Sequence, residues 1–195
     1  MKHLLLIGFS TFALTCASQA ANIAPLGTAG NDGYNGVWGD PTNYINDGTW
    51  AWNNTNGFHS DGSNDTTRLW VTWTDDYLIN EVELWHCEAG PAFVASDYKI
   101  QSLNTGGNPT VDLDWTDIVD VTGNTNVNPT YTFAPVTTAG IRLLVTDPGT
   151  FRDGLLRFEE ILVEGVLAPT APIPEPSTTA LLGLAGLALA FRRRK

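Results

Sequence analysis

The chain has 195 residues and a formal net charge of −11, and its apolar content of 43% is sufficient for a folded core. Between the two predicted targeting segments described below, residues 21–173 carry five basic and 20 acidic side chains, a charge of −15. A surface of this charge repels phosphate backbones, which argues against a nucleic acid partner, and it suits hard cations such as Ca²⁺.

The N-terminus has the pattern of a secretory signal peptide. An apolar run over residues 4–14 is followed by Ser18-Gln19-Ala20, which places small residues where a signal peptidase reads them, so we predict a signal peptide over residues 1–20. The run is too short for a membrane anchor, which needs about 20 apolar residues. After cleavage Cys87 is the only cysteine left, so the domain is expected to fold without an intramolecular disulfide.

The middle of the chain reads as short strands separated by turns. Seven segments rich in β-branched and aromatic residues alternate with clusters of Gly, Pro, Asn and Asp: 68–73, 78–85, 98–103, 117–121, 130–133, 141–145 and 158–163. Leu155-Leu156 is a candidate extension of the last one. In the second segment Leu78, Val82 and Leu84 are expected to face the core, with the intervening glutamates on the other face. The pattern predicts an all-β domain, an antiparallel β-sandwich of the jelly-roll type.

The order of short motifs adds to this pattern. Along the chain occur Asn22-Ile23-Ala24, Ile45-Asn46-Asp47-Gly48, Leu69-Trp70-Val71-Thr72-Trp73, Ile79-Asn80-Glu81-Val82, Tyr98-Lys99-Ile100-Gln101, Gly140-Ile141-Arg142-Leu143 and Glu160-Ile161-Leu162-Val163-Glu164-Gly165. This succession resembles the F5/8 type C, or discoidin-like, galactose-binding fold, which includes many bacterial carbohydrate-binding modules. The resemblance predicts one domain over residues 21–167. Many relatives join their termini with two cysteines, so here strand pairing must join them.

Motifs of enzymes are missing from the sequence. It has no Gly-rich phosphate loop, no nucleophile elbow and no HExxH or CxxC metal motif. His59 and His86 are the only histidines that remain after export, and neither lies in a catalytic motif. A glycosidase pair among the many carboxylates stays open, but a solvated acidic surface explains them more simply. We therefore expect a non-catalytic protein.

Seven tryptophans suggest where a sugar could bind. Trp70, Trp73, Trp85 and Trp115 lie in or beside predicted strands and are expected to pack on the core or on a sheet face. The resemblance implies a ligand surface built by loops at one end of the sandwich from an aromatic residue, a histidine, an arginine and an asparagine. For this chain it points to Trp38, Asn53, His59 and Arg152. Trp50 or Trp52 is more consistent with the buried tryptophan that the family has after its Asp-Gly.

A structural Ca²⁺ is also implied by the resemblance. Carbohydrate-binding relatives often hold one between the Asp-Gly loop and the closing strand, and those positions match Asp47, Thr49 with neighbouring carbonyls, and Glu160. A hard cation takes six to eight oxygen ligands, and Gly48 permits the tight turn that would aim carbonyls inward. The alternative is that Asp47 only caps a turn and Glu160 points to solvent.

The C-terminus has the pattern of a second targeting signal, which follows a spacer over residues 168–173. Pro174-Glu175-Pro176 precedes an apolar stretch over 179–191 and a basic end over 192–195. Those 13 apolar residues span about 20 Å as a helix, against about 30 Å of hydrocarbon core. The tail over 174–195 resembles the PEP-CTERM sorting signal of Gram-negative bacteria, which an exosortase handles in the inner membrane. A simple tail anchor is the alternative.

Together these features predict an exported, non-catalytic protein of the cell surface or extracellular matrix that binds a glycan and passes transiently through the inner membrane. Two alternatives stay open. The same sandwich could be a structural or adhesive component with no sugar site, or it could be an accessory module for a separate glycan-active enzyme.

Overall fold

The structure is a computed structural model that describes residues 20–32, 45–49, 58–60, 66–86, 94–149 and 156–169. The predicted signal peptide and sorting tail lie outside these residues. In the described ranges no helix has the length and apolarity needed to cross a bilayer.

The described residues form an antiparallel β fold. Its strands are β1 (Ala21–Asn22), β2 (Thr28–Asn31), β3 (Phe58–His59), β4 (Thr67–His86), β5 (Asp97–Leu103), β6 (Trp115–Val121), β7 (Thr130–Asp147) and β8 (Arg157–Leu167). Two short 3-10 helices, η1 (Ala24–Leu26) and η4 (Asp112–Asp114), join them. The strand order is β1-β8-β4-β7-β5-β6, with β2 on β4 and β3 on β8, and every pairing is antiparallel. This confirms the predicted fold class.

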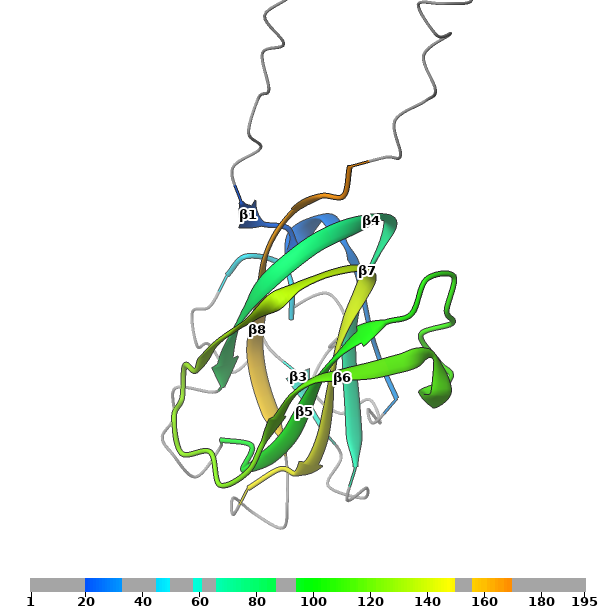
Figure 1. Cartoon of the computed structure of the whole chain (residues 1–195). Coiled ribbons are helices and arrows are strands. Elements are labelled where there is room, and N and C mark those ends of the chain that lie inside the picture. The colour runs from blue at the N-terminus through cyan, green and yellow to red at the C-terminus, as the bar shows by residue number, and fades with distance from the viewer. Residues whose placement is uncertain are drawn as a thin grey trace, which may run out of the picture.

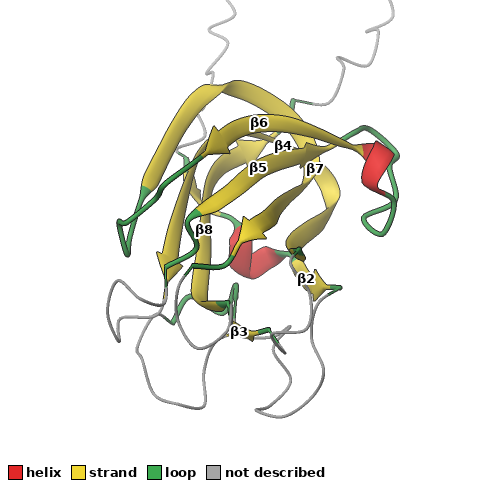
Figure 2. Ribbon diagram, turned by 90° about the horizontal axis from the view of Figure 1, so that it is seen from below, coloured by secondary structure: helices red, strands yellow, loops and turns green. Residues whose placement is uncertain are grey.

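Two long strands build both layers of the sandwich. The first part of β4 pairs with the second part of β7 from Thr67↔Val145 to Thr72↔Gly140, and β5 continues that layer. From Tyr77 onward β4 pairs with β8, which belongs to the other layer. Figure 1 shows β4 and β7 arching over the top of the molecule, and the view from below shows the strands curving around one core (Figure 2).

Four of the predicted strands are parts of two longer strands. Segments 68–73 and 78–85 both belong to β4, and 130–133 and 141–145 both belong to β7. Register shifts between Thr72 and Tyr77 bend β4 without ending it, because a bulge increases local twist and keeps the strand hydrogen-bonded. The polar residues at the bend gave the appearance of a turn.

The alternation predicted for 78–85 is correct only in its second half. Val82 and Leu84 are buried, but Ile79 is buried in place of Leu78, which is half-exposed. A second register shift between Ile79 and Glu81 moves the inward face by one residue. The predicted extension of the last strand is also wrong at Leu156, which precedes β8 and donates its N–H to Ser60 Oγ.

The core lies between the two layers. Leu69, Val71, Ile141 and Leu143 fill it from one layer, and Ile79, Val82, Leu84, Ile161 and Val163 fill it from the other. The strand tryptophans behave as predicted: Trp73 and Trp115 are buried, whereas Trp70 and Trp85 lie half-exposed on outer faces.

Strand pairing joins the two ends of the domain, as expected without a disulfide. β1 pairs with the end of β8 through Ala21↔Gly165 and Asn22↔Glu164. Asn22 Oδ1 also accepts the backbone N–H of Val163 at 3.1 Å. Both chain ends of the sandwich thus leave from the same side (Figure 1).

Candidate functional site

The end of the sandwich away from the chain termini gathers the strand ends of both layers. In one layer Thr67 pairs with Val145 and Asp97 with Asp147. In the other layer β4 ends at His86, opposite Phe158. The backbone N–H of Ala95 donates to His86 Nδ1 at 3.4 Å, which connects the two layers at this end. We call this part of the molecule the loop end.

Of the four predicted sugar-binding residues, only His59 falls in a described range. Trp38, Asn53 and Arg152 lie outside the described residues. The backbone of His59 is described in β3, where it pairs with Arg157, but its side chain is not. The role of each of the four residues stays a prediction.

His86 is a buried residue of the loop end for which the sequence predicted no role. Its ring packs edge-on against Phe158 at 4.7 Å and lies 5.9 Å from the Tyr98 ring. Burial lowers the pKa of His86 to about 4, so the ring is neutral at neutral pH. Its role in this position is to pack the two layers together.

The expected calcium position shows a buried acid beside the Asp-Gly loop. Glu160 is fully buried, and its Oε1 accepts the Gly48 N–H at 3.0 Å. Its Oε2 is buried with no hydrogen-bond partner in the described structure. Burial, with a smaller effect of the Asp47 charge, raises the pKa of Glu160 to about 8, although the backbone of Asp47 and Gly48 opposes the shift. The alternative in which Glu160 points to solvent is therefore wrong.

The other two expected ligands have a different geometry. Asp47 and Thr49 are exposed, and Asp47 Oδ1 accepts the Thr49 N–H at 2.7 Å, which is the turn-capping contact. Gly48 has φ +79°, a conformation that favours glycine. Within the described ranges no three His, Cys, Asp or Glu side chains cluster closely enough to hold a metal. A cation at Glu160 Oε2 would therefore need backbone carbonyls or water for most of its ligands.

A cleft of about 370 Å³ lies on the outer face of the β2–β4 layer. Arg68 and Trp70 of β4 point to this face because the alternating Leu69 and Val71 point to the core. The cleft is also lined by Asn31, Asp32, Thr110 and Asp112. The loop over residues 104–114, which we call the 104–114 loop, forms one wall.

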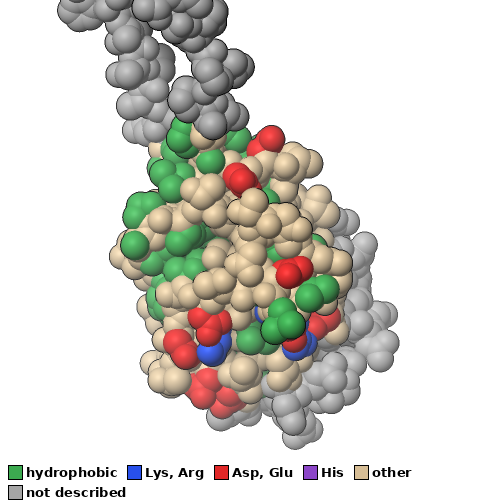
Figure 3. Space-filling model, turned by 45° about the vertical axis from the view of Figure 1, so that its right-hand side comes forward, with side chains coloured by type: hydrophobic (Ala, Val, Ile, Leu, Met, Phe, Trp, Pro, Cys, Tyr) green, Lys and Arg blue, Asp and Glu red, His purple; other side chains and the backbone are tan. Residues whose placement is uncertain are grey.

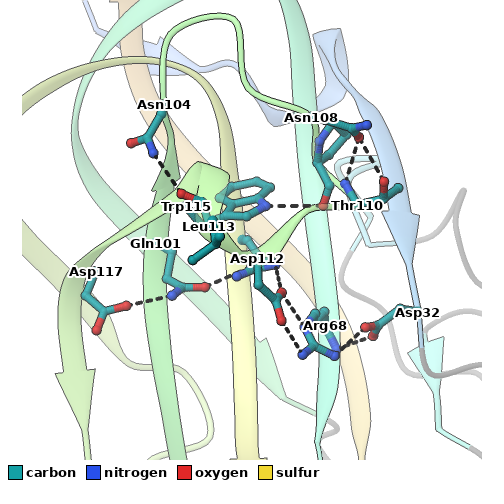
Figure 4. Close-up of polar contacts among 12 residues, drawn as sticks. Asp32, Arg68, Gln101, Asn104, Asn108, Thr110, Asp112, Leu113, Trp115 and Asp117 are labelled. Carbon is teal, nitrogen blue, oxygen red and sulfur yellow. Dashed lines mark hydrogen bonds and ion pairs between the residues drawn. The ribbon is translucent and has the colours of Figure 1, made fainter.

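Charged hydrogen bonds fix this wall to the sheet. Asp112 accepts two bonds from Arg68, from Nε at 2.9 Å and from Nη2 at 2.8 Å, and a third from Arg142 Nη1 at 2.8 Å. Arg68 Nη1 also donates to Asp32 at 2.6 Å, so this guanidinium lies between two carboxylates (Figure 4). Both arginines hold the pKa of Asp112 below its usual range, Arg68 more strongly.

Arg142 continues the network beneath the loop. Its side chain is only 1% exposed, its Nε donates to Gln101 at 2.8 Å, and it lies 4.7 Å from the Trp115 ring centroid. Nothing in the sequence marks this cluster, because its hydrogen-bonded partners are 30 to 44 residues apart and belong to different elements. Only one part of the cleft could have been predicted: Arg68 and Trp70 alternate with core residues of β4 and therefore share its outer face.

Comparisons with known proteins identify the tail and the fold. Residues 172–195 match the PEP-CTERM protein-sorting motif, two residues earlier than the tail expected from the sequence. Curated proteins compared by sequence gave no match. Several solved carbohydrate-binding modules have the same fold.

Three of these structures show the extent of the likeness. The family 32 module of Clostridium perfringens NanJ in complex with galactose is 20% identical, with a TM-score of 0.60 over 75% of this chain and 98% of that one. Chitosan-binding module 1 of a Paenibacillus sp. IK-5 chitosanase/glucanase is 24% identical, with 0.59 over 73% and 98%. A Streptococcus pneumoniae fucose-binding module is 15% identical, with 0.58 over 74% and 95%. The chain therefore has the β-sandwich fold of these modules, as its motif order suggested.

Proposed function

We propose that this protein is an exported, non-catalytic glycan-binding protein of the cell surface or extracellular matrix. The observation that supports the proposal is the presence of two features in one chain: the fold of a carbohydrate-binding module, of which 98% is covered, and a PEP-CTERM tail. Convergence of the strand ends of both layers at the loop end supports a site built by Trp38, Asn53, His59 and Arg152. An aromatic face stacks on a sugar ring while the polar groups bond its hydroxyls.

The charge of the protein favours one class of glycan. A chain with net charge −11 repels uronic acid and sialic acid polymers and is compatible with neutral or amino-sugar polymers. Similar modules bind galactose, fucose and chitosan according to their descriptions, all of which fall in that class.

The structural alternative is an adhesive matrix protein with no sugar site. Affinity electrophoresis of the purified chain through gels that contain galactan, chitosan or polygalacturonate separates the two. We expect retardation by galactan or chitosan and none by polygalacturonate. A folded chain that all three gels leave unretarded supports the adhesive role, and retardation by polygalacturonate alone contradicts the charge argument.

Ca²⁺ is the cofactor that fits the buried acid. Glu160 Oε2 would supply a carboxylate oxygen, and Asp47 and the carbonyls near Thr49 would complete the shell. A bound cation would neutralise a carboxylate that the fold otherwise buries without a positive partner. It would also tie the Asp-Gly loop to the last strand.

The tail completes the proposal. An exosortase-type enzyme would recognise Pro174-Glu175-Pro176 after the signal peptide has directed export, while the basic residues 192–195 hold the tail on the cytoplasmic side of the inner membrane. This path fits a Gram-negative cell.

A further inference from the structure

We propose that the cleft on the outer face of the β2–β4 layer is a second glycan subsite, next to the loop end, which binds a neutral hexopyranose unit of a polysaccharide. The proposal rests on the glycan-binding function above and assigns it a second contact. Its described lining residues come from the end of β2 with Asp32 beyond it, from β4 and from the 104–114 loop.

The aromatic wall of the cleft is Trp70. Gly30 lies directly across from Trp70 in the β2–β4 pairing, and a Cβ at Gly30 would overlap the indole. One side of the ring thus rests on the backbone of β2, which holds the ring in place. Trp70 is half-buried, so part of the indole stays open to solvent. A fixed aromatic face is suited to stacking on a sugar ring.

The polar wall is Arg68. A guanidinium has five N–H donors, and the bonds to Asp32 and Asp112 use three of them. The side chain is 27% exposed, so its remaining donors can reach a ligand in the cleft. Because two carboxylates already fix the group, binding would lose little side-chain entropy.

The third wall is rigid as well. Asp114 Oδ2 accepts the Asn108 N–H at 2.7 Å, and Trp115 Nε1 donates to Pro109 O at 3.2 Å. Together with the bonds of Asp112, these contacts hold the 104–114 loop against the sheet. Thr110 lies exposed in this loop and contributes to the mouth of the cleft.

The charge of the cleft selects the ligand. Two carboxylates surround one half-buried arginine, and in the lower part of the face seen in Figure 3 the Lys and Arg side chains lie among Asp and Glu side chains. Asp32 and Asp112 already balance the charges of Arg68 and Arg142, so a uronate carboxylate would meet two aspartates and no arginine that lacks a carboxylate partner. Neutral hydroxyls, by contrast, can donate to the aspartates and accept from Arg68.

Affinity electrophoresis through galactan, glucan and polygalacturonate gels tests the subsite. Trp70→Ala removes the aromatic wall, and Thr110→Trp fills the mouth from an exposed position, so it keeps the fold even if Trp70→Ala does not. The matched control is Trp85→Ala, which removes another half-exposed outer-face tryptophan of β4, one that donates to Glu83 at 2.8 Å away from the cleft. Thermal melting establishes that each variant is folded.

We expect galactan or glucan to retard the wild-type chain and either cleft variant to raise the dissociation constant about tenfold, since two subsites on one polysaccharide act together. Trp85→Ala should bind as the wild type does. If the folded Thr110→Trp variant is retarded as strongly as the wild type, the cleft is not a subsite. Glycan binding at the loop end would still stand. If neither these gels nor the chitosan gel retards the folded wild type, both proposals fail. Loss of polygalacturonate binding in the cleft variants would overturn the choice of a neutral sugar.

Discussion

Three buried ionisable side chains show how individual residues meet the same physical problem differently. Arg142 keeps its charge because Asp112, Gln101 and the Trp115 ring surround it. His86 is neutral among aromatic rings. Glu160 has one backbone N–H at one oxygen and no partner at the other. Burying a charge without compensation is strongly unfavourable. The surroundings of each side chain therefore determine whether it is neutral or needs a partner of opposite charge.

Protonation of His86 should destabilise the fold. Its pKa is about 4 in the folded protein against 6.5 when unfolded, so between these values the unfolded chain binds more protons. The free energy of unfolding should therefore fall as the pH drops from about 6.5 to about 4, by about 3 kcal/mol from this residue. Urea unfolding at a series of pH values measures it.

The matched control for that experiment is His86→Gln, which retains an acceptor for Ala95 but does not titrate. Its loss of stability over the same pH range should be smaller than that of the wild type by about the same 3 kcal/mol. Equal acid sensitivity in the two proteins would contradict the neutral, buried state of His86.

At the scale of elements, the sequence predicted strand positions better than strand continuity. Each of the seven predicted segments lies inside a strand, because alternating β-branched and aromatic residues mark them directly. The joining of two segments into β4 could not be predicted, because the polar residues at its bend are also those of a turn. The cleft was equally hidden, since Asp32, Arg68 and Asp112 meet only through the sheet and the folded 104–114 loop.

The 104–114 loop should depend on Asp112. Asp112→Ala removes the carboxylate shared by Arg68 and Arg142 and leaves a nearly buried guanidinium with fewer partners, so we expect a loss of about 2 kcal/mol in the free energy of unfolding. Asp120→Ala is the control, because Asp120 is exposed and 3.7 Å from Lys99, and it should change stability by less than about 0.5 kcal/mol. Equal effects in urea unfolding would contradict the role of Asp112.

The link between the Asp-Gly loop and β8 should respond to calcium. At a free concentration about 100 times its dissociation constant, a bound ion adds roughly 2.7 kcal/mol, which raises the melting temperature by roughly 5 to 10 °C for a domain of this size. Melting in EDTA and then in millimolar Ca²⁺ measures the shift. Glu160→Gln and Asp47→Ala should abolish it and Asp75→Ala, an exposed acid elsewhere, should keep it. A shift that survives in Glu160→Gln would place the ion at another position.

At the scale of the whole molecule, the chain ends and the loop end lie on opposite sides of the sandwich. β1 and the end of β8 bring both chain ends to one side, and the loop end lies at the other. The sorting tail, residues 172–195, therefore follows the end that is farthest from the proposed loop site. A protein attached or processed through this tail would present its glycan site outward.

Sorting should fail without stopping export when the tail is altered. Replacing Glu175, or deleting residues 192–195, leaves the signal peptide intact, so the chain should still cross the inner membrane but keep its tail and miss its final location. Cell fractionation and the mass of the recovered protein measure both steps. Wild-type location and normal tail removal in the two variants would contradict the sorting role.

The most direct measurement of the central claim is binding of the purified chain to a glycan array, with its folding checked by thermal melting in the same buffer. Our account predicts selective binding to neutral or amino-sugar glycans, with Trp38→Ala and His59→Ala binding about tenfold more weakly. A cooperatively folded chain that binds no glycan on the array would contradict it.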